Sequence, residues 1–239
     1  MIENLREVVS HTHGLGNLEV VKITGEESST SFMSVAANKE VLLKSLFFEV
    51  DPDFEGVFGI GDVGRLAAIL NIPEYRIDAT MKINRKNGDP VSVEISNGSN
   101  DVRNEYRFMA RELIDAQLPD KKRRSITWNV SIEPSPLSVQ RLKSQAMAIG
   151  SGISTFHAHT KDGALHISLG EASSHTGEFI FAKDVQGALQ SISEWPLHPV
   201  LSILNLPGTK TMDISEAGIM QIVVKTEIAE HQYSIFAKA

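Results

Sequence analysis

Apolar side chains recur with helical spacing in two stretches of the chain. The stretches begin near residues 2 and 136, and their apolar positions are Ile2, Leu5, Val8 and Val9 in the first and Val139, Leu142, Ala146 and Ile149 in the second. Side chains three and four positions apart lie on one face of a helix. The pattern therefore predicts an amphipathic helix in each stretch.

Two shorter apolar segments have nearly the same sequence. Residues 66–73 (LAAILNIP) return as residues 200–207 (VLSILNLP), 134 positions later in a chain of 239. Proline lacks a backbone N–H and disfavours helix in the residue before it, so each copy predicts a helix that ends just before its proline. The helices near residues 2 and 136 have the same separation. We therefore infer a tandem duplication.

Alternating apolar and polar residues predict strands after each copy. The predicted strands are residues 75–82, 91–96 and 105–111 in the first half and residues 211–215, 219–228 and 231–237 in the second. Residues 84–89 and 160–163 are predicted hairpin connections, the first with Asn87-Gly88 as its turn. Each half thus consists of helix, strands, helix and strands, which is an α+β unit with antiparallel sheets.

The connection between the halves lies within residues 114–125, which contain Pro119 and the basic run Lys121–Arg124. The predicted domains are residues 1–118 and 126–239, joined by a linker of residues 119–125. Each is large enough for a core of its own.

Composition narrows the classes of function. The chain has no cysteine, so disulfides, thiolate metal sites and a cysteine nucleophile are excluded. No apolar run reaches the ~18–20 residues that span a bilayer, and the first residues lack a signal-peptide pattern. Neither a phosphate-binding glycine loop nor a nucleophile-elbow sequence is present. We therefore expect a protein without a membrane segment and without a cofactor.

Charge is distributed unevenly. The formal net charge is −7 overall, but the linker carries a net charge of +3. Three windows contain no Asp or Glu, namely residues 63–73, 134–161 and 195–212, and they include three of the four predicted helices. One explanation is that buried helices exclude charge of either sign. The other is that these helices face a polyanion, with acids absent and a few basic residues left to contact phosphates.

Two similar halves with two helices and β-sheet each, a central linker and acid-poor helices resemble a DNA sliding clamp. The similar stretches are residues 58–71, 126–150, 160–168 and the ending 231–236. Within that superfamily, the order of elements is most similar to the processivity factors of T-even-type phages and, more distantly, to proliferating cell nuclear antigen (PCNA). None of these stretches is a diagnostic motif.

The resemblance implies an architecture and a function without an active site. Protomers of this size would close head-to-tail as a homotrimer, with helices lining a central hole and antiparallel sheets forming the outer shell. The implied partners are duplex DNA bound without sequence preference, a replicative DNA polymerase, a clamp loader and further copies of the chain. For a phage protein the location would be the host-cell cytoplasm.

The resemblance also assigns residues by position. The hole-facing candidates are Arg6, Arg65, Arg141, Lys143 and Lys210. The partner-peptide candidates are Leu118, Pro119 and Ile126 near the linker and Phe236, Ala237, Lys238 and Ala239 at the C-terminus. The basic linker departs from the family pattern, so its role as a peptide surface is open.

Other classes of function remain open. One is a β-rich structural or assembly protein, for example of a phage, in which duplication serves packing. Another is an enzyme with scattered site residues such as His157, His159 and Asp53. His157 and His159 lie on one face of a predicted strand, as metal ligands do. With His166 and His175 near them but no carboxylate in the window, we expect surface histidines and no metal site. For residues 51–55 (DPDFE), proline and charge density predict a turn.

Overall fold

The computed structural model describes residues 2–120, 125–150, 152–170 and 175–238. The chain divides by its internal contacts into two compact units. Unit 1 comprises residues 1–37, 43–122 and 228–231, and unit 2 comprises residues 38–42, 123–227 and 232–239. The division along the chain falls between residues 122 and 123, and strands β3 and β15 give residues to both units.

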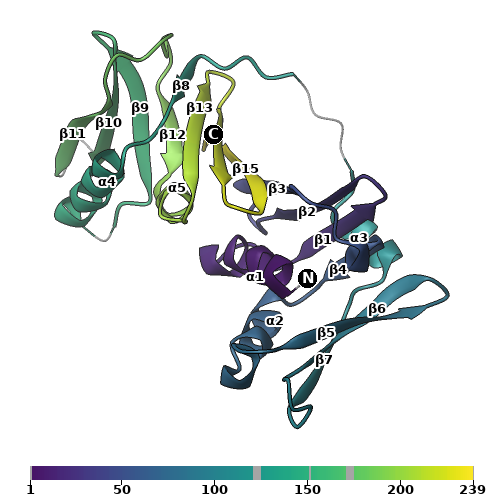
Figure 1. Cartoon of the computed structure of the whole chain (residues 1–239). Helices are drawn as coiled ribbons and strands as arrows, with labels where there is room; N and C mark the ends of the chain where they lie inside the picture. The colour runs from purple at the N-terminus through teal and green to yellow at the C-terminus, as the bar shows by residue number, and fades with distance from the viewer. Residues whose placement is uncertain (1, 121–124, 151, 171–174, 239) are drawn as a thin grey trace. The chain divides into compact units, whose positions relative to one another are not determined.

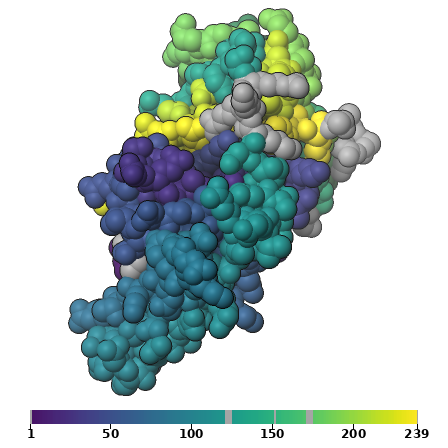
Figure 2. Space-filling view, turned by 90° about the vertical axis from the view of Figure 1, so that its right-hand side faces the viewer, coloured from purple at the N-terminus to yellow at the C-terminus, as the bar shows by residue number. Residues whose placement is uncertain are grey.

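Unit 1 contains two antiparallel sheets and a pair of helices (Figure 1). Its elements are α1 (Ile2–Ser10), η1 (His13–Leu15), β1 (Val21–Glu26), β2 (Ser29–Val35), β3 (Val41–Phe47), η2 (Pro52–Phe54), β4 (Gly56–Ile60), α2 (Val63–Leu70), η3 (Pro73–Tyr75), β5 (Thr80–Lys86), β6 (Asp89–Ser96), β7 (Arg103–Arg107) and α3 (Arg111–Gln117). Strands β4, β1, β2 and β3 follow one another in this order within the eight-stranded sheet of the chain, and β5-β6-β7 form a separate three-stranded sheet. In the space-filling view, the segment of β5 to β7 forms one continuous blue-to-teal surface of this unit (Figure 2).

Unit 2 repeats this arrangement. Its elements are β8 (Val130–Ile132), α4 (Pro136–Ile149), β9 (Thr155–Lys161), β10 (Ala164–Gly170), β11 (Thr176–Ala182), β12 (Ser193–Pro196), α5 (Leu197–Leu204), β13 (Thr209–Ser215), β14 (Ile219–Lys225) and β15 (Ala229–Phe236). Strands β11-β10-β9-β12 form a four-stranded sheet, and β15, β14, β13 and β8 follow one another in this order within the eight-stranded sheet. Helix α4 packs on β10 and β11, and α5 packs on β9 and β12.

The predicted duplication is evident in the helices. Helix α1 begins at Ile2 and α4 at Pro136, with the separation that the sequence repeat predicts. Helices α2 and α5 have eight residues each and end alike: the Asn71 N–H donates to the Ala67 carbonyl at 3.0 Å, and the Asn205 N–H donates to the Leu201 carbonyl at 3.1 Å. All four predicted helices are confirmed.

Each unit has its own core beneath its helix pair. In unit 1, α1 and α2 lie side by side and bury Leu5 and Leu66, both with 0% exposed surface (Figure 1). In unit 2, Leu142 of α4 and Trp195 of β12 are buried at 0% and 1% exposed. Apolar residues on one face of each helix are therefore what fixes the helices to the sheets.

Each of the six predicted strands is present, but every one differs from its predicted range at one end or both. The strand expected over residues 75–82 begins only at Thr80, because Tyr75 ends η3 and Asp78 has a left-handed backbone with φ of 54°. The Tyr75 hydroxyl is anchored in the core, where it donates a hydrogen bond to Asn104 Oδ1 at 2.7 Å. The strand expected to reach residue 111 ends at Arg107, and α3 follows it. In unit 2, β14 ends at Lys225 instead of residue 228, and β15 runs from Ala229 to Phe236 instead of residues 231–237.

The predicted turns are present. Asn87 and Gly88 have φ values of 53° and 92° and connect β5 to β6, as the type I′ hairpin requires. Residues 51–55 form a capped turn, in which the Asp51 side chain accepts from the Asp53 N–H at 3.0 Å. No helix of the described ranges is long and apolar enough to cross a membrane.

Candidate nucleic-acid interface

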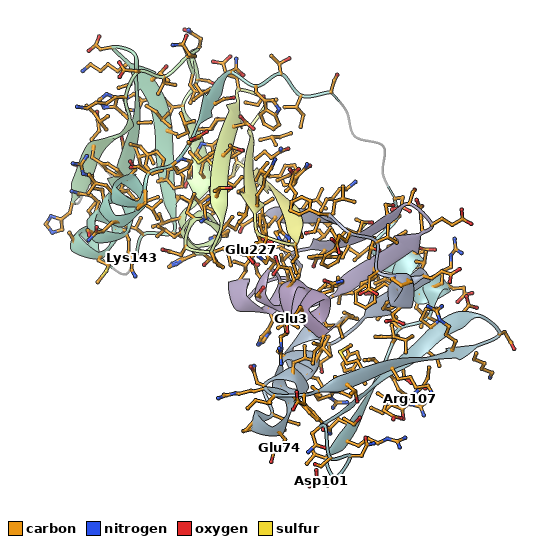
Figure 3. The ribbon with its side chains drawn as sticks, viewed as in Figure 1. Glu3, Glu74, Asp101, Arg107, Lys143 and Glu227 are labelled. Atoms are coloured by element: carbon orange, nitrogen blue, oxygen red, sulfur yellow. The ribbon has the colours of Figure 1, made fainter. Side chains whose placement is uncertain are left out.

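Helix α4 presents the longest acid-free surface of unit 2. Ser135 caps its first turn by accepting from the Ser138 N–H at 3.1 Å, and Pro136 starts the helix at a position where a missing N–H has no cost. Val139 and Leu142 face the core, which leaves Arg141 and Lys143 exposed. Lys143 extends from the helix into solvent (Figure 3).

A groove of about 790 Å³ lies beside α4. Three lysines line it: Lys143 of α4, Lys210 of β13 and Lys225 of β14. Gln140, Asn205 and Thr211 add polar groups, and Glu133 is the one carboxylate among the described residues that line it. Three ammonium groups against one carboxylate make a surface suited to phosphate oxygens.

The side chain of Lys210 is held in this groove by a backbone carbonyl group. Its Nζ donates to the Gly208 carbonyl at 2.9 Å, and burial lowers the pKa of its ammonium. Gly208 has φ of +106°, and a Cβ added there would clash with the Lys225 carbonyl oxygen. Only glycine allows the turn after α5 to pass so close to β14, and that turn places Lys210 at the groove.

Arg141 lies in a different place. It lines a second groove of about 400 Å³ together with Lys183, Leu137 and Ile180, between α4 and β11. The structure therefore brings two of the three predicted residues of this unit together, Lys143 and Lys210, and sets Arg141 apart. Lys225 and Lys183 are not predicted from the sequence, since each sits at or after the end of a strand with no repeated pattern around it.

In unit 1, the two predicted DNA-facing residues, Arg65 and Arg6, differ in how free their side chains are to contact a phosphate. Arg65 of α2 is 74% exposed, and its Nε lies 3.9 Å from an Asp62 carboxylate oxygen. Asp62 also caps α2 by accepting from the Arg65 N–H at 2.8 Å. Arg6 of α1 is instead engaged, because Nη1 lies 2.6 Å from Glu3 Oε1 and Nη2 donates to the Tyr75 carbonyl at 2.8 Å. Arg65 is the better placed of the two to contact a phosphate.

The predicted peptide-binding residues have mixed exposure. Leu118 is 6% exposed and ends α3, where its N–H donates to the Ile114 carbonyl. Pro119 is exposed and Ile126 is half-buried. Lys121–Arg124 and Ala239 lie outside the described residues. Leu118 therefore supports the core beneath the linker and offers little surface to a peptide.

The C-terminal residues are fixed to unit 2. The Phe236 N–H donates to the Glu40 carbonyl, the Ala237 N–H to that of Gly218 and the Lys238 N–H to that of Glu194, at 2.9–3.0 Å. The side chain of Phe236 is nevertheless 37% exposed. Phe236 is thus a fixed aromatic surface residue.

A cavity of about 280 Å³ was not anticipated. It lies in unit 1 beside Asp120, the last described residue before the linker gap, and Phe32, Met33 and Lys44 contribute to its lining. Lys22 lies at its base, with Nζ 2.7 Å from Asp115 Oδ1 and 3.0 Å from Asp120 Oδ2. No sequence pattern links Lys22 to residues almost a hundred positions away.

The histidines differ from the expectation. His159 and His166 face each other across β9 and β10, as the hairpin predicts, with ring centroids 5.3 Å apart. Glu178 of β11 supplies the carboxylate that the acid-free window lacks, 2.9 Å from His166 Nδ1. The expectation that no carboxylate accompanies these histidines is therefore wrong, because the acid comes from the next strand of the sheet. His157 pairs instead with Glu194 of β12 in the strand register.

Neither a protein-family model nor a curated protein sequence matches the chain. Solved structures do match it. A PCNA from A. fulgidus, solved with the C-terminal region of FEN-1 bound, superposes with a TM-score of 0.73 at 10% identity, covering 100% of this chain and 96% of that one. PCNA from Thermococcus kodakaraensis superposes with a TM-score of 0.70 at 14% identity, covering 98% and 97%. The chain therefore has the PCNA-like DNA-clamp fold over its whole length.

Proposed function

We propose that the chain is a sliding clamp that encircles duplex DNA and tethers a DNA polymerase, without catalytic activity of its own. The observation that carries the proposal is the likeness to PCNA along 98–100% of the chain. The helix-and-sheet unit occurs twice in the chain, so three copies would supply six similar units to a ring.

The proposed DNA-facing residues are Arg65, Arg141, Lys143, Lys210 and Lys225. All lie on or next to the paired helices, and helices α2, α4 and α5 contain no carboxylate. Contacts between lysine or arginine and phosphate are independent of sequence and weakened by salt. A ring held by topology needs only such weak contacts, because tight ones would stop it from sliding.

The proposed ring is a homotrimer closed through edge strands, as in the phage processivity factors that the sequence resembles. The candidate strands are β7, one of the two edges of the sheet β5-β6-β7 in unit 1, and β11, one of the two edges of the sheet β11-β10-β9-β12 in unit 2. An edge strand presents unpaired N–H and C=O groups that can pair with another chain. Pairing of β7 with the next protomer's β11 gives a heterologous interface that closes when its rotation divides the circle.

Charge supports this pairing. Strand β7 carries exposed Arg107, whereas β11 carries Glu178, whose side chain is 50% exposed. The other charges of β7 are Arg103, which pairs with Glu94 at 2.6 Å, and exposed Glu105. Arg107 extends from the edge strand in Figure 3. Opposite charges across an interface favour the intended partner and disfavour two copies of the same edge.

The proposed partners are peptides of a polymerase and of a clamp loader. The FEN-1 segment in the A. fulgidus structure is a peptide bound to a clamp. In this chain, the candidate surfaces are Pro119, Ile126 and the cavity beside Asp120, together with the exposed ring of Phe236.

The test is the oligomeric mass of the chain combined with its retention on DNA. Light scattering at micromolar concentration is expected to give three protomers. After loading by a matching clamp loader, the chain is expected to stay on closed circular DNA and to leave the same DNA once it is linearised. A stable monomer that remains equally on both DNA forms contradicts the proposal. Larger open assemblies without polymerase stimulation would instead indicate the structural or assembly protein.

A further inference from the structure

We propose that Glu7, His11 and His231 bind one divalent transition-metal ion of the zinc class within unit 1. The inference rests on a buried side-chain cluster that shares no residue with the proposed DNA-facing and peptide-binding sets. It does not depend on the proposed function.

The three ligand atoms converge from segments far apart in sequence. Glu7 and His11 are one turn apart at the end of α1, where the His11 N–H donates to the Glu7 carbonyl at 3.1 Å. His231 is in β15, in the part assigned to unit 1. Glu7 Oε1 lies 2.9 Å from His231 Nε2 and 3.5 Å from His11 Nε2, and all three atoms are within 4.8 Å of one another.

These separations suit a tetrahedral ion. With metal–ligand bonds of about 2.0–2.2 Å, neighbouring ligand atoms are roughly 3.3 Å apart. The Glu7–His11 and Glu7–His231 separations bracket this value. Binding therefore requires the two imidazole rings to turn out of their stacked arrangement, while the distances to Glu7 change little.

The two imidazole rings lie face to face, so each ring has to turn before both Nε2 lone pairs can point to one ion. Their rings are stacked with centroids 3.5 Å apart and planes 10° apart, and both residues are 0% exposed. A divalent ion bound by both Nε2 atoms leaves both rings neutral and gives the Glu7 carboxylate a cation.

Ser45 provides the outer contact that metal-binding histidines usually have. Its Oγ lies 2.9 Å from His231 Nδ1, and it is 4% exposed. When Nδ1 carries the ring proton and donates it to Ser45, Nε2 presents its lone pair toward Glu7. Such outer contacts fix the tautomer and orientation of the ligand ring.

The chemistry of the ligands selects the class of ion. Imidazole nitrogens favour Zn²⁺, Co²⁺ and Ni²⁺, whereas Mg²⁺ and Ca²⁺ prefer oxygen ligands. Glu7 has a side chain that is 15% exposed, so the fourth position can be taken by water on its side. The bound ion would fasten α1 to the His231 segment and so stabilise unit 1.

The cluster of His159, His166 and Glu178 in unit 2 provides a matched comparison. It has the same ligand types, but its side chains are 25%, 15% and 50% exposed. A hydrated glutamate on a surface strand is not held in place for an ion as a buried one is. We therefore expect the unit 1 cluster to bind the ion more tightly.

The experiment uses the full chain after metal removal with a chelator, titrated with Zn²⁺ by calorimetry. One equivalent is expected to bind and to raise the melting temperature, Co²⁺ is expected to give the visible absorption of a tetrahedral site, and Mg²⁺ is expected to give no signal. Glu7→Gln, close to isosteric, is expected to weaken Zn²⁺ binding at least tenfold, and Ser45→Ala about tenfold. The double variant His159→Ala/His166→Ala is the control and is expected to leave binding unchanged.

Several outcomes overturn the proposal. If the metal-free chain does not bind Zn²⁺, the three side chains are held together by hydrogen bonds and not by an ion. Zn²⁺ binding that survives Glu7→Gln but is lost in the control variant places the ion in unit 2 instead. Circular dichroism in the presence of chelator confirms that Glu7→Gln is folded, so that loss of binding is not loss of structure.

Discussion

Lys22 and Asp120 form an ion pair in which the lysine Nζ lies 3.0 Å from the carboxylate Oδ2. The same ammonium lies 2.7 Å from Asp115 Oδ1. Burial by itself lowers the pKa of Lys22, but hydrogen bonds and charge from the two carboxylates outweigh it and the net pKa is raised. The hydrogen bond from Lys22 in turn lowers the pKa of Asp115. The pair therefore fixes the chain to β1 directly before the linker.

Replacing Lys22 with methionine is expected to release Asp120 from β1 while keeping most of the buried volume. Since both carboxylates are partly exposed and can be rehydrated, we expect a loss of about 1–2 kcal/mol in the free energy of unfolding. Trypsin is expected to cleave within Lys121–Arg124 faster than in the wild type. An unchanged cleavage rate would show that the ion pair does not restrain the linker.

The pH dependence of this difference serves as its control. The raised pKa of Lys22 adds stability that is present below its unfolded pKa and is lost as the pH rises through the folded value. The lowered pKa of Asp115 adds stability that is present above its unfolded pKa and is lost as the pH falls through the folded value. Urea unfolding should thus show a constant difference between wild type and variant from about pH 5 to 9, and a smaller one at both extremes. A difference that varies within this range would point to another cause.

Charge reversal in the lysine groove is expected to weaken DNA binding. The variant Lys143→Glu/Lys210→Glu places two carboxylates beside Lys225, so short duplex DNA at low salt should bind at least tenfold more weakly. The slope of log affinity against log salt should fall by about 0.9 for each phosphate that the variant no longer neutralises. Fluorescence anisotropy with labelled DNA measures both quantities.

Lys161→Glu is the matched control for this groove. Lys161 is an exposed lysine at the end of β9 and is absent from the lining of the groove. Lys161→Glu changes the net charge by half as much as the double variant does, and at another place on unit 2. If it weakens binding half as much as the double variant, net charge and not the groove determines the affinity.

Local pattern accounts for the helices and the duplication. The 134-residue repeat predicts the positions of α1, α2, α4 and α5, because apolar spacing and a terminating proline act within a few residues. Helix α3 was missed, since residues 111–117 have too few apolar positions to define a face: only Ile114 of this helix is buried. The strand expected at Tyr75 starts later because the core burial of that side chain overrides its local alternation.

The sites were harder to predict because tertiary structure assembles them. Lys143 and Lys210 were identified by position in a resemblance, yet Lys225 joins them only through the pairing of β13 with β14. His231 contacts Glu7 although the two residues are 224 positions apart, and no pattern within one sequence predicts such a contact. Acid-free windows likewise say nothing about the carboxylate that a neighbouring strand supplies.

Gly208→Ala is expected to destabilise unit 2 by about 2–3 kcal/mol. The added Cβ meets the Lys225 carbonyl oxygen at a positive φ, so the turn after α5 has to move. Urea unfolding measures the change. Gly14→Ala is the control, since a Cβ at Gly14 meets nothing within 4 Å. Equal stability of the two variants would show that the turn adapts without strain.

The edge-strand interface can be tested by exchanging charges. Arg107→Glu is expected to weaken trimer formation about tenfold, because the new carboxylate on β7 would face the Glu178 carboxylate on β11 of the next protomer. Glu178→Arg alone should have a similar effect, and the double variant should restore the trimer. Sedimentation over a range of concentrations gives the assembly constants. Failure of the double variant to recover would place the subunit contact on other strands.

Phe236→Ala is expected to weaken the binding of polymerase or loader peptides at least tenfold and to leave the trimer intact. The backbone of residues 236–238 makes three hydrogen bonds within unit 2, so truncation would disturb the unit itself, whereas removal of the ring leaves these bonds in place. Aromatic rings that bury their area on binding are frequent anchors of interfaces. Ile192→Ala is the control, because Ile192 is a more exposed apolar residue of the same unit. Calorimetry with the C-terminal peptide of a cognate polymerase measures the affinity, and loss of the trimer with unchanged peptide binding would assign Phe236 to the contact between subunits.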